Sequence, residues 1–425
     1  MPVRVQLEIV FYPNKCPNLD EKRSNHLTYL KHFSHSNARN IDWTSSPRGI
    51  EYLNIHESKC DISRCPFAKT IKYFVTDKLR GDIDLRECVN LRVFKCYGNS
   101  KHIIEINGMH NLVYLQLDNY SGMCDLPNLK YARVRNSYQM YFNNVSNLTN
   151  LDILFCHHVI DVSALRNLRK LRCVLQNING IASAKYLEEL NVIDYLSRLN
   201  LHELPRLRKL TYSGPHVILD GSTQLNSLRC SETNAILTNL PNLTNLSMIY
   251  CKSIIIDDLP NVEKLYVRGA NDVDISKIKN VIRCDVVSCQ NVSNLHNLNK
   301  LEYLMCSNCG NISNITCCKN LKIISMGNCH VSSYIDDLSM KCIYGILCYD
   351  STIHMNISES SDLQILAISQ EHNIAGIDSA IAKYPKIKYS INEQISNRTY
   401  YALEEYIDKH INKRYIDRLD FINYL

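Results

Sequence analysis

The segment LEYLMCSNCGNISNITCC, residues 301–318, supports two interpretations. Cys306 and Cys309 form a C-x-x-C motif, and Cys317 and Cys318 follow it, which is a spacing that zinc sites use. The same segment begins with LEYLMC, an apolar-x-x-apolar-x-apolar pattern. Whether this pattern recurs elsewhere in the chain decides between a metal site and a structural repeat.

The pattern recurs in about 17 units, each roughly 17 to 22 residues after the last. If the first apolar residue of a unit is position 1, positions 3 to 7 predict a short strand, with positions 4 and 6 pointing inward and 3, 5 and 7 outward. No unit can bury its inner side alone, so the units are expected to stack around one core. The units begin at Ile50, Ile71, Leu91, Leu112, Leu129, Leu151, Leu168, Leu187, Leu207, Leu225, Leu243, Val262, Val281, Leu301, Leu321, Ile343 and Leu363.

The pattern resembles that of the leucine-rich-repeat superfamily, L-x-x-L-x-L-x-x-N/C, over residues 50–390. The resemblance implies an α/β repeat solenoid, a horseshoe with a long parallel β-sheet on its concave face and short turns or 3₁₀ segments on the convex side. The repeats also resemble the cysteine-containing subclass, which is common in F-box substrate receptors of ubiquitin ligases. The units here are shorter than in that subclass, and residues 1–49 lack an F-box pattern.

The cysteines fall at two repeat positions, which favours a structural interpretation over zinc. A cysteine at inward position 6 acts as a small apolar residue, and one at position 9 is expected to bond the backbone where the chain leaves the strand. We therefore expect no metal and no cofactor, and assign no role to Cys317 and Cys318. Position 6 holds Cys96, Cys156, Cys173, Cys230, Cys306 and Cys348, and position 9 holds Cys251, Cys289, Cys309 and Cys329.

Composition sets broad limits on location and partners. The 425 residues carry 48 basic and 42 acidic side chains, a net charge of +6 that is too small to indicate a nucleic-acid binder by itself. The start, MPVRVQLEIVFYP, is not a signal peptide, and no run approaches the ~18 apolar residues that span a membrane. We expect a cytoplasmic protein with reduced thiols. Its richness in Ile, Asn, Lys and Tyr is typical of AT-rich genomes, including those of large viruses.

The two ends of the solenoid are expected to be capped, because a stack of strands otherwise exposes unpaired edges. Residues 1–49 are predicted to form an N-terminal cap with a strand over 3–12 and a short helix over 20–34. Residues 391–425 are predicted to form a C-terminal capping helix, in which Leu403, Ile407 and Ile411 share one face. A docking helix for a partner is the alternative for this segment. Uneven spacing around Leu129 marks a place for a kink.

No catalytic motif was found. The chain lacks G-x-x-x-x-G-K-[ST], G-x-G-x-x-G, H-E-x-x-H and G-x-S-x-G, and we interpret the His157–His158 pair as surface histidines. We therefore expect a binding protein and not an enzyme.

The outward strand positions are the candidate binding site. Between Leu91 and Leu225 they are mostly basic, with Asp118 and Glu189 as the acidic exceptions, and aromatic residues lie towards the N-terminal side. Tyr and Arg are enriched at binding hot spots, so we expect a protein partner with an acidic or phosphorylated surface. A ubiquitin-ligase substrate receptor, or phosphate and nucleic-acid binding through the basic patch, are the alternatives; a membrane partner is not expected. The candidate residues are Tyr52, Tyr73, Lys95, Tyr97, Tyr114, Tyr131, Arg133, Arg135, Phe155, His157, Lys170, Arg172, Lys209 and Arg229.

Overall fold

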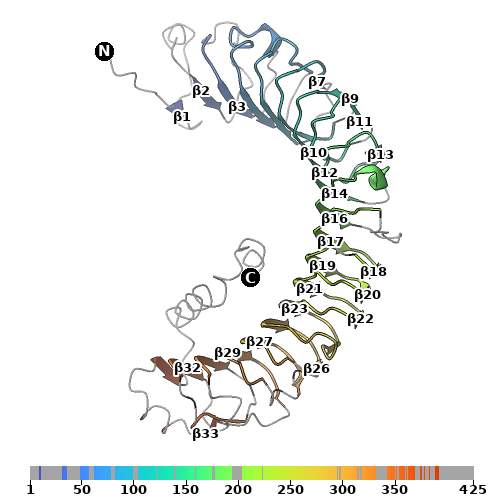
Figure 1. The fold of residues 1–425 in the computed structure, drawn as a ribbon. Coiled ribbons are helices and arrows are strands. Elements are labelled where there is room, and N and C mark those ends of the chain that lie inside the picture. The colour runs from blue at the N-terminus through green and yellow to red at the C-terminus, as the bar shows by residue number, and fades with distance from the viewer. Residues whose placement is uncertain are drawn as a thin grey trace. The chain divides into compact units, whose positions relative to one another are not determined.

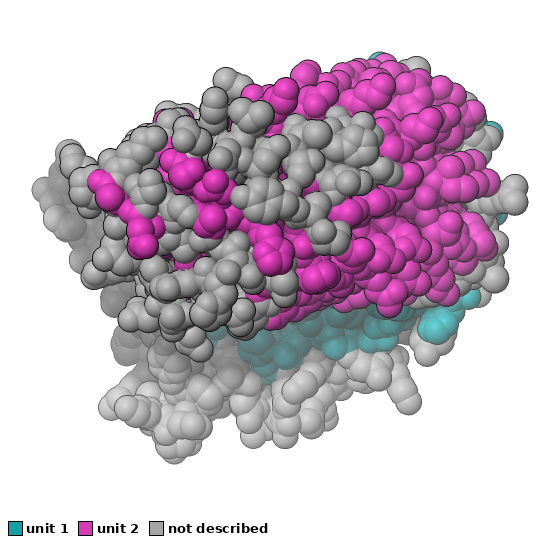
Figure 2. Space-filling view, turned by 90° about the horizontal axis from the view of Figure 1, so that it is seen from below, with its two compact units in different colours: residues 1–211 teal, residues 212–425 magenta. Residues whose placement is uncertain are grey.

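The computed structural model describes most of the repeat region and little of either end. The described residues are 9–10, 31–35, 48–56, 62–77, 82–98, 104–120, 122–137, 140–157, 159–174, 178–193, 203–222, 224–293, 295, 298–313, 315, 318–331, 342–349, 351, 354–358, 360, 362–368, 374–375, 378, 382 and 388–391. The chain divides into two compact units, residues 1–211 and 212–425 (Figure 2). Each unit is described by itself.

Both units are stacks of parallel strands, each strand pairing with the corresponding strand of the next repeat (Figure 1). In the first unit they are β1 (Ile9–Val10), β2 (His32–His35), β3 (Tyr52–His56), β4 (Tyr73–Asp77), β6 (Val93–Tyr97), β8 (Tyr114–Asp118), β10 (Tyr131–Arg135), β12 (Asn150–Leu154), β14 (Lys170–Val174) and β16 (Glu189–Ile193). The division between the units falls within β17 (Lys209–Ser213). The second unit has β19 (Ser227–Ser231), β21 (Asn245–Ile249), β23 (Lys264–Arg268), β25 (Arg283–Val287), β27 (Tyr303–Ser307), β29 (Ile323–Gly327), β30 (Gly345–Tyr349), β32 (Ile365–Ile368) and β34 (Lys388–Ile391).

The return side of each repeat carries turns and short extended pieces, with almost no helix in the described residues. In the first unit, β5 (Ile83–Asp84) pairs with β7 (Ile104–Glu105), β9 (Gly122–Asp125) with β11 (Met140–Asn143), and β13 (Ile160–Asp161) with β15 (Ile178–Asn179), beside 3₁₀ turns η2 (Ile62–Arg64) and η4 (Ile181–Ser183). In the second unit these pieces are β18 (His216–Asp220), β20 (Asn234–Thr238), β22 (Ser253–Asp257), β24 (Asp272–Asp274), β26 (Asn291–Ser293), β28 (Asn311–Ile312), β31 (Met355–Asn356) and β33 (Ile374–Ala375). The predicted leucine-rich-repeat solenoid is confirmed.

The core is built from repeat positions 1, 4 and 6, as the pattern predicts. In the repeat that starts at Leu91, that residue, Phe94 and Cys96 are all fully buried. Phe94 stacks on Phe74 of the preceding repeat, with ring centroids 5.3 Å apart. The same positions therefore supply both the inside of each repeat and the contact between repeats.

One repeat was assigned three residues too late in the sequence. Strand β12 begins at Asn150, which lies opposite Tyr131, so position 1 of this repeat is Leu148 and not Leu151. The error arose because LDILFC also satisfies the apolar pattern. With Leu148 as the start, the long gap after Leu129 disappears, and with it the sequence argument for a kink there.

Positions 8 and 9 form the turn that leaves the strand. Position 8 has a left-handed backbone in many repeats, including Asn119 (φ 59°), Asn136 (φ 52°) and Asn308 (φ 54°). Asparagine tolerates this conformation better than most residues. The N–H of Asn119 donates to the carbonyl of Arg135 in the next repeat at 2.8 Å, so the turn extends the bonding between repeats beyond the strand.

The cysteines of the opening segment occupy the predicted core and turn positions. Cys306 and Cys309 are each 1% exposed. The Sγ of Cys309 donates to the carbonyl of Ser307 at 3.5 Å, and Cys251 and Cys289 make the same contact in their own repeats. Cys156 belongs to this second group, because the corrected start places it at position 9 and not at position 6. Cys318 is buried, and Cys317 lies outside the described residues.

A row of asparagines just before position 1 was not predicted. The Nδ2 of each donates to a backbone carbonyl in the preceding repeat: Asn128 to His110 at 2.6 Å and Asn147 to Pro127 at 2.8 Å. We call this row the asparagine ladder. Its other members are Asn90, Asn111, Asn167, Asn261, Asn280 and Asn320. The recurring L-P-N-L and L-T-N-L junctions in the sequence were its signal.

Most of the two predicted caps lies outside the described residues. Of the expected strand 3–12, residues 9–10 form β1. Residues 32–34, at the end of the expected helix, lie in strand β2, which pairs in parallel with β3. Residues 392–425 are outside the described part. No helical segment among the described residues is long and apolar enough to cross a membrane.

Candidate functional site on the concave face

The candidate site is the solvent side of the strands in the first unit. We define the concave face as the side chains at positions 3, 5 and 7 of β3 to β16, together with Lys209. The alternating burial of these strands turns one set of side chains into the core and leaves most of this set accessible; Gln116, Leu154 and Val174 are the buried exceptions. A surface of this kind is rigid, because strand pairing fixes the spacing of its side chains.

Aromatic side chains follow position 3 along the first strands. Tyr52 lies between His32 and Tyr73, with ring centroids 5.5 and 6.1 Å away, and Tyr114 stacks on Tyr131 at 6.3 Å. The structure thus brings together four of the predicted tyrosines in two rows. Tyr73 and Tyr131 are 42% and 43% exposed, so these rings remain available to a partner although they contact each other.

Two further predicted residues extend the aromatic rows. The Lys95 Nζ lies over the ring of Tyr114, 5.1 Å from its centroid, which is a cation–π contact. Tyr97 occupies position 7 and is 37% exposed. Burial of its hydroxyl, with a smaller contribution from Tyr114, raises the pKa of Tyr97, so the phenol is a neutral donor at physiological pH.

The basic part of the face is more compensated than the sequence indicated. Arg133 donates from Nε to Oδ2 of Asp152 at 2.7 Å. Asp152 was not recognised as an outward residue because of the misplaced repeat start. It lies in register between Arg133 and Arg172, so between Leu91 and Leu225 it joins Asp118 and Glu189 as a third acidic group.

An exposed cation without an ion pair among the described residues lies on β14. Lys170 and Lys209 both approach Glu189, with Nζ to carboxylate distances of 2.9 and 3.9 Å. Arg172 is exposed and forms no ion pair with any described residue. Because it is exposed, Arg172 is available to bind an anionic group of a partner.

Several buried polar atoms on the face have no hydrogen-bond partner among the residues that the structure describes. They are Asn54 Oδ1, Asp77 Oδ1, Asp118 Oδ1, Arg135 Nε and Asp152 Oδ1. An unsatisfied buried polar group costs about 1–3 kcal/mol, so such groups are rare in stable folds. All five lie at positions 5 or 7, which face away from the core.

Three predicted residues do not belong to this face. Phe155 and His157 occupy positions 8 and 10, after the end of β12, because of the corrected repeat start. Arg229 lies on β19 in the second unit. His158 lies outside the described residues.

Phe155 is nevertheless an unusual residue beside the face. It is 60% exposed and holds a left-handed backbone (φ 56°) at the position where many other repeats have Asn or Gly. An aromatic residue in this conformation is strained, and strain of this kind is concentrated at functional sites. Tyr250 repeats both properties in the second unit.

No chemistry other than binding is evident in the described residues. No three His, Cys, Asp or Glu side chains there lie close enough together to hold a metal ion. Burial raises the pKa of several thiols, to about 12 for Cys96 and Cys348, so these groups are protonated and unreactive at neutral pH.

The arrangement defines a parallel β-solenoid of leucine-rich repeats, and comparison with solved structures agrees. A leucine-rich-repeat protein of Leptospira interrogans superposes with a TM-score of 0.54 at 17% identity, covering 72% of this chain and 91% of that one. The functional domain of the internalin InlJ from Listeria monocytogenes, which includes a cysteine ladder, gives 0.48 at 18% identity and covers 78% and 75%. The internalin InlF from the same species gives 0.39 at 16% identity, with 66% and 86% covered.

Sequence comparisons add nothing to this result. No family model matches the chain, and no curated protein matches its sequence. At these identities the structural likeness establishes the fold alone.

Proposed function

We propose that the chain is a non-catalytic scaffold that binds a partner protein across the concave face of its first unit. The observation that carries the proposal is the pair of tyrosine rows on that face, in which Tyr73 and Tyr131 stay 42% and 43% exposed although they contact neighbouring rings. A protein surface that lies on the face would bury these rings and gain free energy from the apolar area removed from water.

The face also has the composition of a binding surface. Exposed tyrosines at Tyr73 and Tyr131 provide apolar contact area at a small entropic cost, since their neighbours already restrict them. Arg172, two strands beyond Tyr131, provides an exposed guanidinium that forms no ion pair with the described residues. We infer a partner that places a carboxylate or phosphate against β14 and an apolar segment against the tyrosine rows.

Affinity capture with matched variants tests this function. The full chain is compared with Tyr131→Ala and Arg172→Ala on the face, and with Tyr141→Ala and Arg166→Ala, which are exposed residues of the return side. We expect the two face variants to lose a captured protein that the two return-side variants retain. Loss of about 2 kcal/mol of binding free energy is typical of hot-spot residues.

Two results would contradict the proposal. Equal capture by all four variants would mean that the concave face of the first unit is not the site. Capture of nucleic acid with an affinity that falls steeply with salt would replace the protein partner by a polyanion.

A further inference from the structure

Positive charge is concentrated in one short stretch of the first unit. Residues 169–209 hold eight basic and four acidic side chains, so 41 of the 425 residues carry four of the six net positive charges. The stretch runs from position 2 of the repeat that starts at Leu168 to position 3 of the repeat that starts at Leu207. Its charges therefore lie on three neighbouring repeats, where they act together on an acidic partner.

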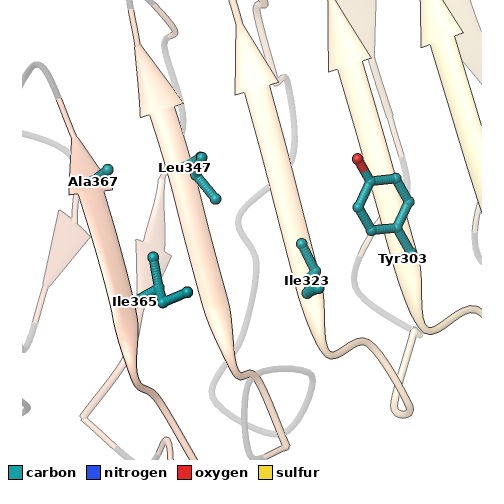
Figure 3. Packing of buried hydrophobic residues seen from close by; sticks show 5 residues of the cluster. All are labelled: Tyr303, Ile323, Leu347, Ile365 and Ala367. Atoms are coloured by element: carbon teal, nitrogen blue, oxygen red, sulfur yellow. The ribbon is translucent and has the colours of Figure 1, made fainter. Parts of the chain in front are cut away.

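The last strands of the second unit present the opposite situation. Five apolar side chains at positions 3 and 5 of β27, β29, β30 and β32 pack together and are only 0–4% exposed, so a partner cannot reach them (Figure 3). These side chains are Tyr303, Ile323, Leu347, Ile365 and Ala367.

The asparagine ladder is interrupted within the basic stretch. In five successive repeats of the first unit, the position just before the first residue holds Asn90, Asn111, Asn128, Asn147 and Asn167. In the next two repeats, the same position holds Tyr186 and Arg206. The Cζ of Arg206 lies over the Tyr186 ring, 4.4 Å from its centroid, so a cation–π contact replaces the amide bond of the ladder.

The interruption places an aromatic ring and a cation in solvent. Tyr186 is 44% exposed, and Arg206 is exposed beside it. A departure from a stabilising contact that the other repeats share is typical of functional positions. The contact with the ring restricts the Arg206 guanidinium, whose N–H donors lie in its plane and remain able to bind a carboxylate.

A second arginine without an ion pair lies close by in the sequence. Arg169, Glu188 and Arg208 occupy position 2 of three successive repeats, and backbone hydrogen bonds join them in that order. The Nη1 of Arg169 donates to the Oε1 of Glu188 at 3.3 Å, so Glu188 compensates the charge of Arg169. Arg206 and Arg208 are both exposed and form no ion pair with any described residue.

We propose that Tyr186, Arg206 and Arg208 form a second contact surface, which binds an acidic segment of a partner protein. We call these three residues the arginine edge. The two guanidinium groups bind Asp or Glu carboxylates of the segment, and the exposed part of the Tyr186 ring packs against its apolar atoms. The arginine edge lies ahead of the strands and not on the concave face, so this inference does not depend on the proposed function.

The charges favour an acidic protein segment over a nucleic acid. Glu188 and Glu203 lie among the cations of the basic stretch. A nucleic-acid strand carries a phosphate on every nucleotide, so it would also place negative charge against these two carboxylates. A protein segment can carry its carboxylates only where the arginines are.

Fluorescence anisotropy with the full chain tests the arginine edge. The probe is a fluorescein-labelled peptide that alternates glutamate and glycine, and the matched peptide with glutamine is its control. The double variant Tyr186→Asn/Arg206→Asn restores the ladder residue at both positions, and we expect it to bind the glutamate peptide about tenfold more weakly or worse. Arg92→Ala removes an exposed arginine at position 2 of a distant repeat and should change the affinity by less than about twofold.

Urea unfolding separates a lost contact from a lost fold. The two new asparagines can bond the carbonyls of Arg166 and Lys185, as Asn167 bonds that of Ser146, so the urea midpoint of the double variant should be no lower than that of the parent. Arg208→Ala alters no ladder position, and it should weaken peptide binding by about threefold or more at an unchanged midpoint.

Three results would overturn the inference. The first is parental affinity for the glutamate peptide in both the double variant and Arg208→Ala. The second is equal binding of the glutamine peptide, which would show that carboxylates are not recognised. The third is tighter binding of a single-stranded oligodeoxythymidine of the same length, which would make a nucleic acid the occupant.

Discussion

Arg133 and Arg172 are expected to differ in their effect on stability, although both occupy position 5 of the repeats on either side of the one that starts at Leu148. They flank Asp152 in register, on β10 and β14. The Nε of Arg133 donates to the Oδ2 of Asp152 at 2.7 Å, while Arg172 forms no ion pair among the described residues. The Asp152 side chain is only 14% exposed, and its Oδ1 already lacks a partner.

The cost of Arg133→Ala follows from these contacts. A half-exposed ion pair contributes about 0–1 kcal/mol, and the Arg133 side chain is 41% exposed. Loss of the Arg133 side chain also leaves the mostly buried carboxylate of Asp152 without a cation. A buried acceptor left unsatisfied in this way costs about 1–3 kcal/mol. We expect Arg133→Ala to lower the free energy of unfolding by about 1.5–2 kcal/mol, and Arg172→Ala to change it by no more than about 0.5 kcal/mol.

Urea unfolding followed by circular dichroism measures both values. The double variant Arg133→Ala/Asp152→Ala is the control, because removing the orphaned carboxylate should recover about 1 kcal/mol of the loss. Equal destabilisation by the two single variants would refute the reasoning, as would a double variant less stable than Arg133→Ala. Arg172→Ala is for this reason the cleaner variant for binding experiments.

Three further predictions concern stability. Hydrogen bonds from Lys31 and Lys72 lower the pKa of Glu51 from 4.5 to about 2. As the pH falls, the Glu51 carboxylate is protonated in the unfolded chain before it is protonated in the folded one, so its contribution to stability is lost between these two pH values. Thermal melts should show that Glu51→Gln removes this pH dependence. Asn147→Ala, which breaks one bond of the asparagine ladder, should lower the unfolding free energy by about 1 kcal/mol in urea. Phe155→Asn should raise the free energy of unfolding by about 0.5–1 kcal/mol, and with it the urea midpoint, because asparagine suits the left-handed backbone; a lower midpoint would contradict this explanation.

The strands were predictable from the sequence because the core constrains them. Positions 1, 4 and 6 must be apolar in every repeat, so the series of patterns locates each strand even where a single copy is weak. The exception shows the limit of this signal. Leu148, Leu151 and Leu154 allow two starts in one repeat, and only the pairing of Asn150 with Tyr131 distinguishes them.

The site was predictable only in outline. Outward positions identify which side chains reach the face, and most of the predicted tyrosines and basic residues lie there. Their pairing was not predictable, because the contact of Arg133 with Asp152 depends on the register between two repeats. The unsatisfied atoms depend on the burial of individual oxygens and nitrogens, which no sequence pattern encodes. The shortest return strands, such as β5 and β7, could not be located because two residues carry no periodicity.

The asparagine ladder has a consequence for how such a chain changes length over generations. In eight repeats an asparagine just before the first residue donates to the carbonyl two residues before the first residue of the preceding repeat, as Asn147 does to Pro127. These repeats can therefore follow one another without creating a new kind of junction. Recombination that inserts or removes one whole repeat of this kind would leave the junctions between such repeats bonded, whereas a shift of a few residues would break one. The gene can lengthen or shorten the sheet there in repeat-sized steps without redesigning the fold.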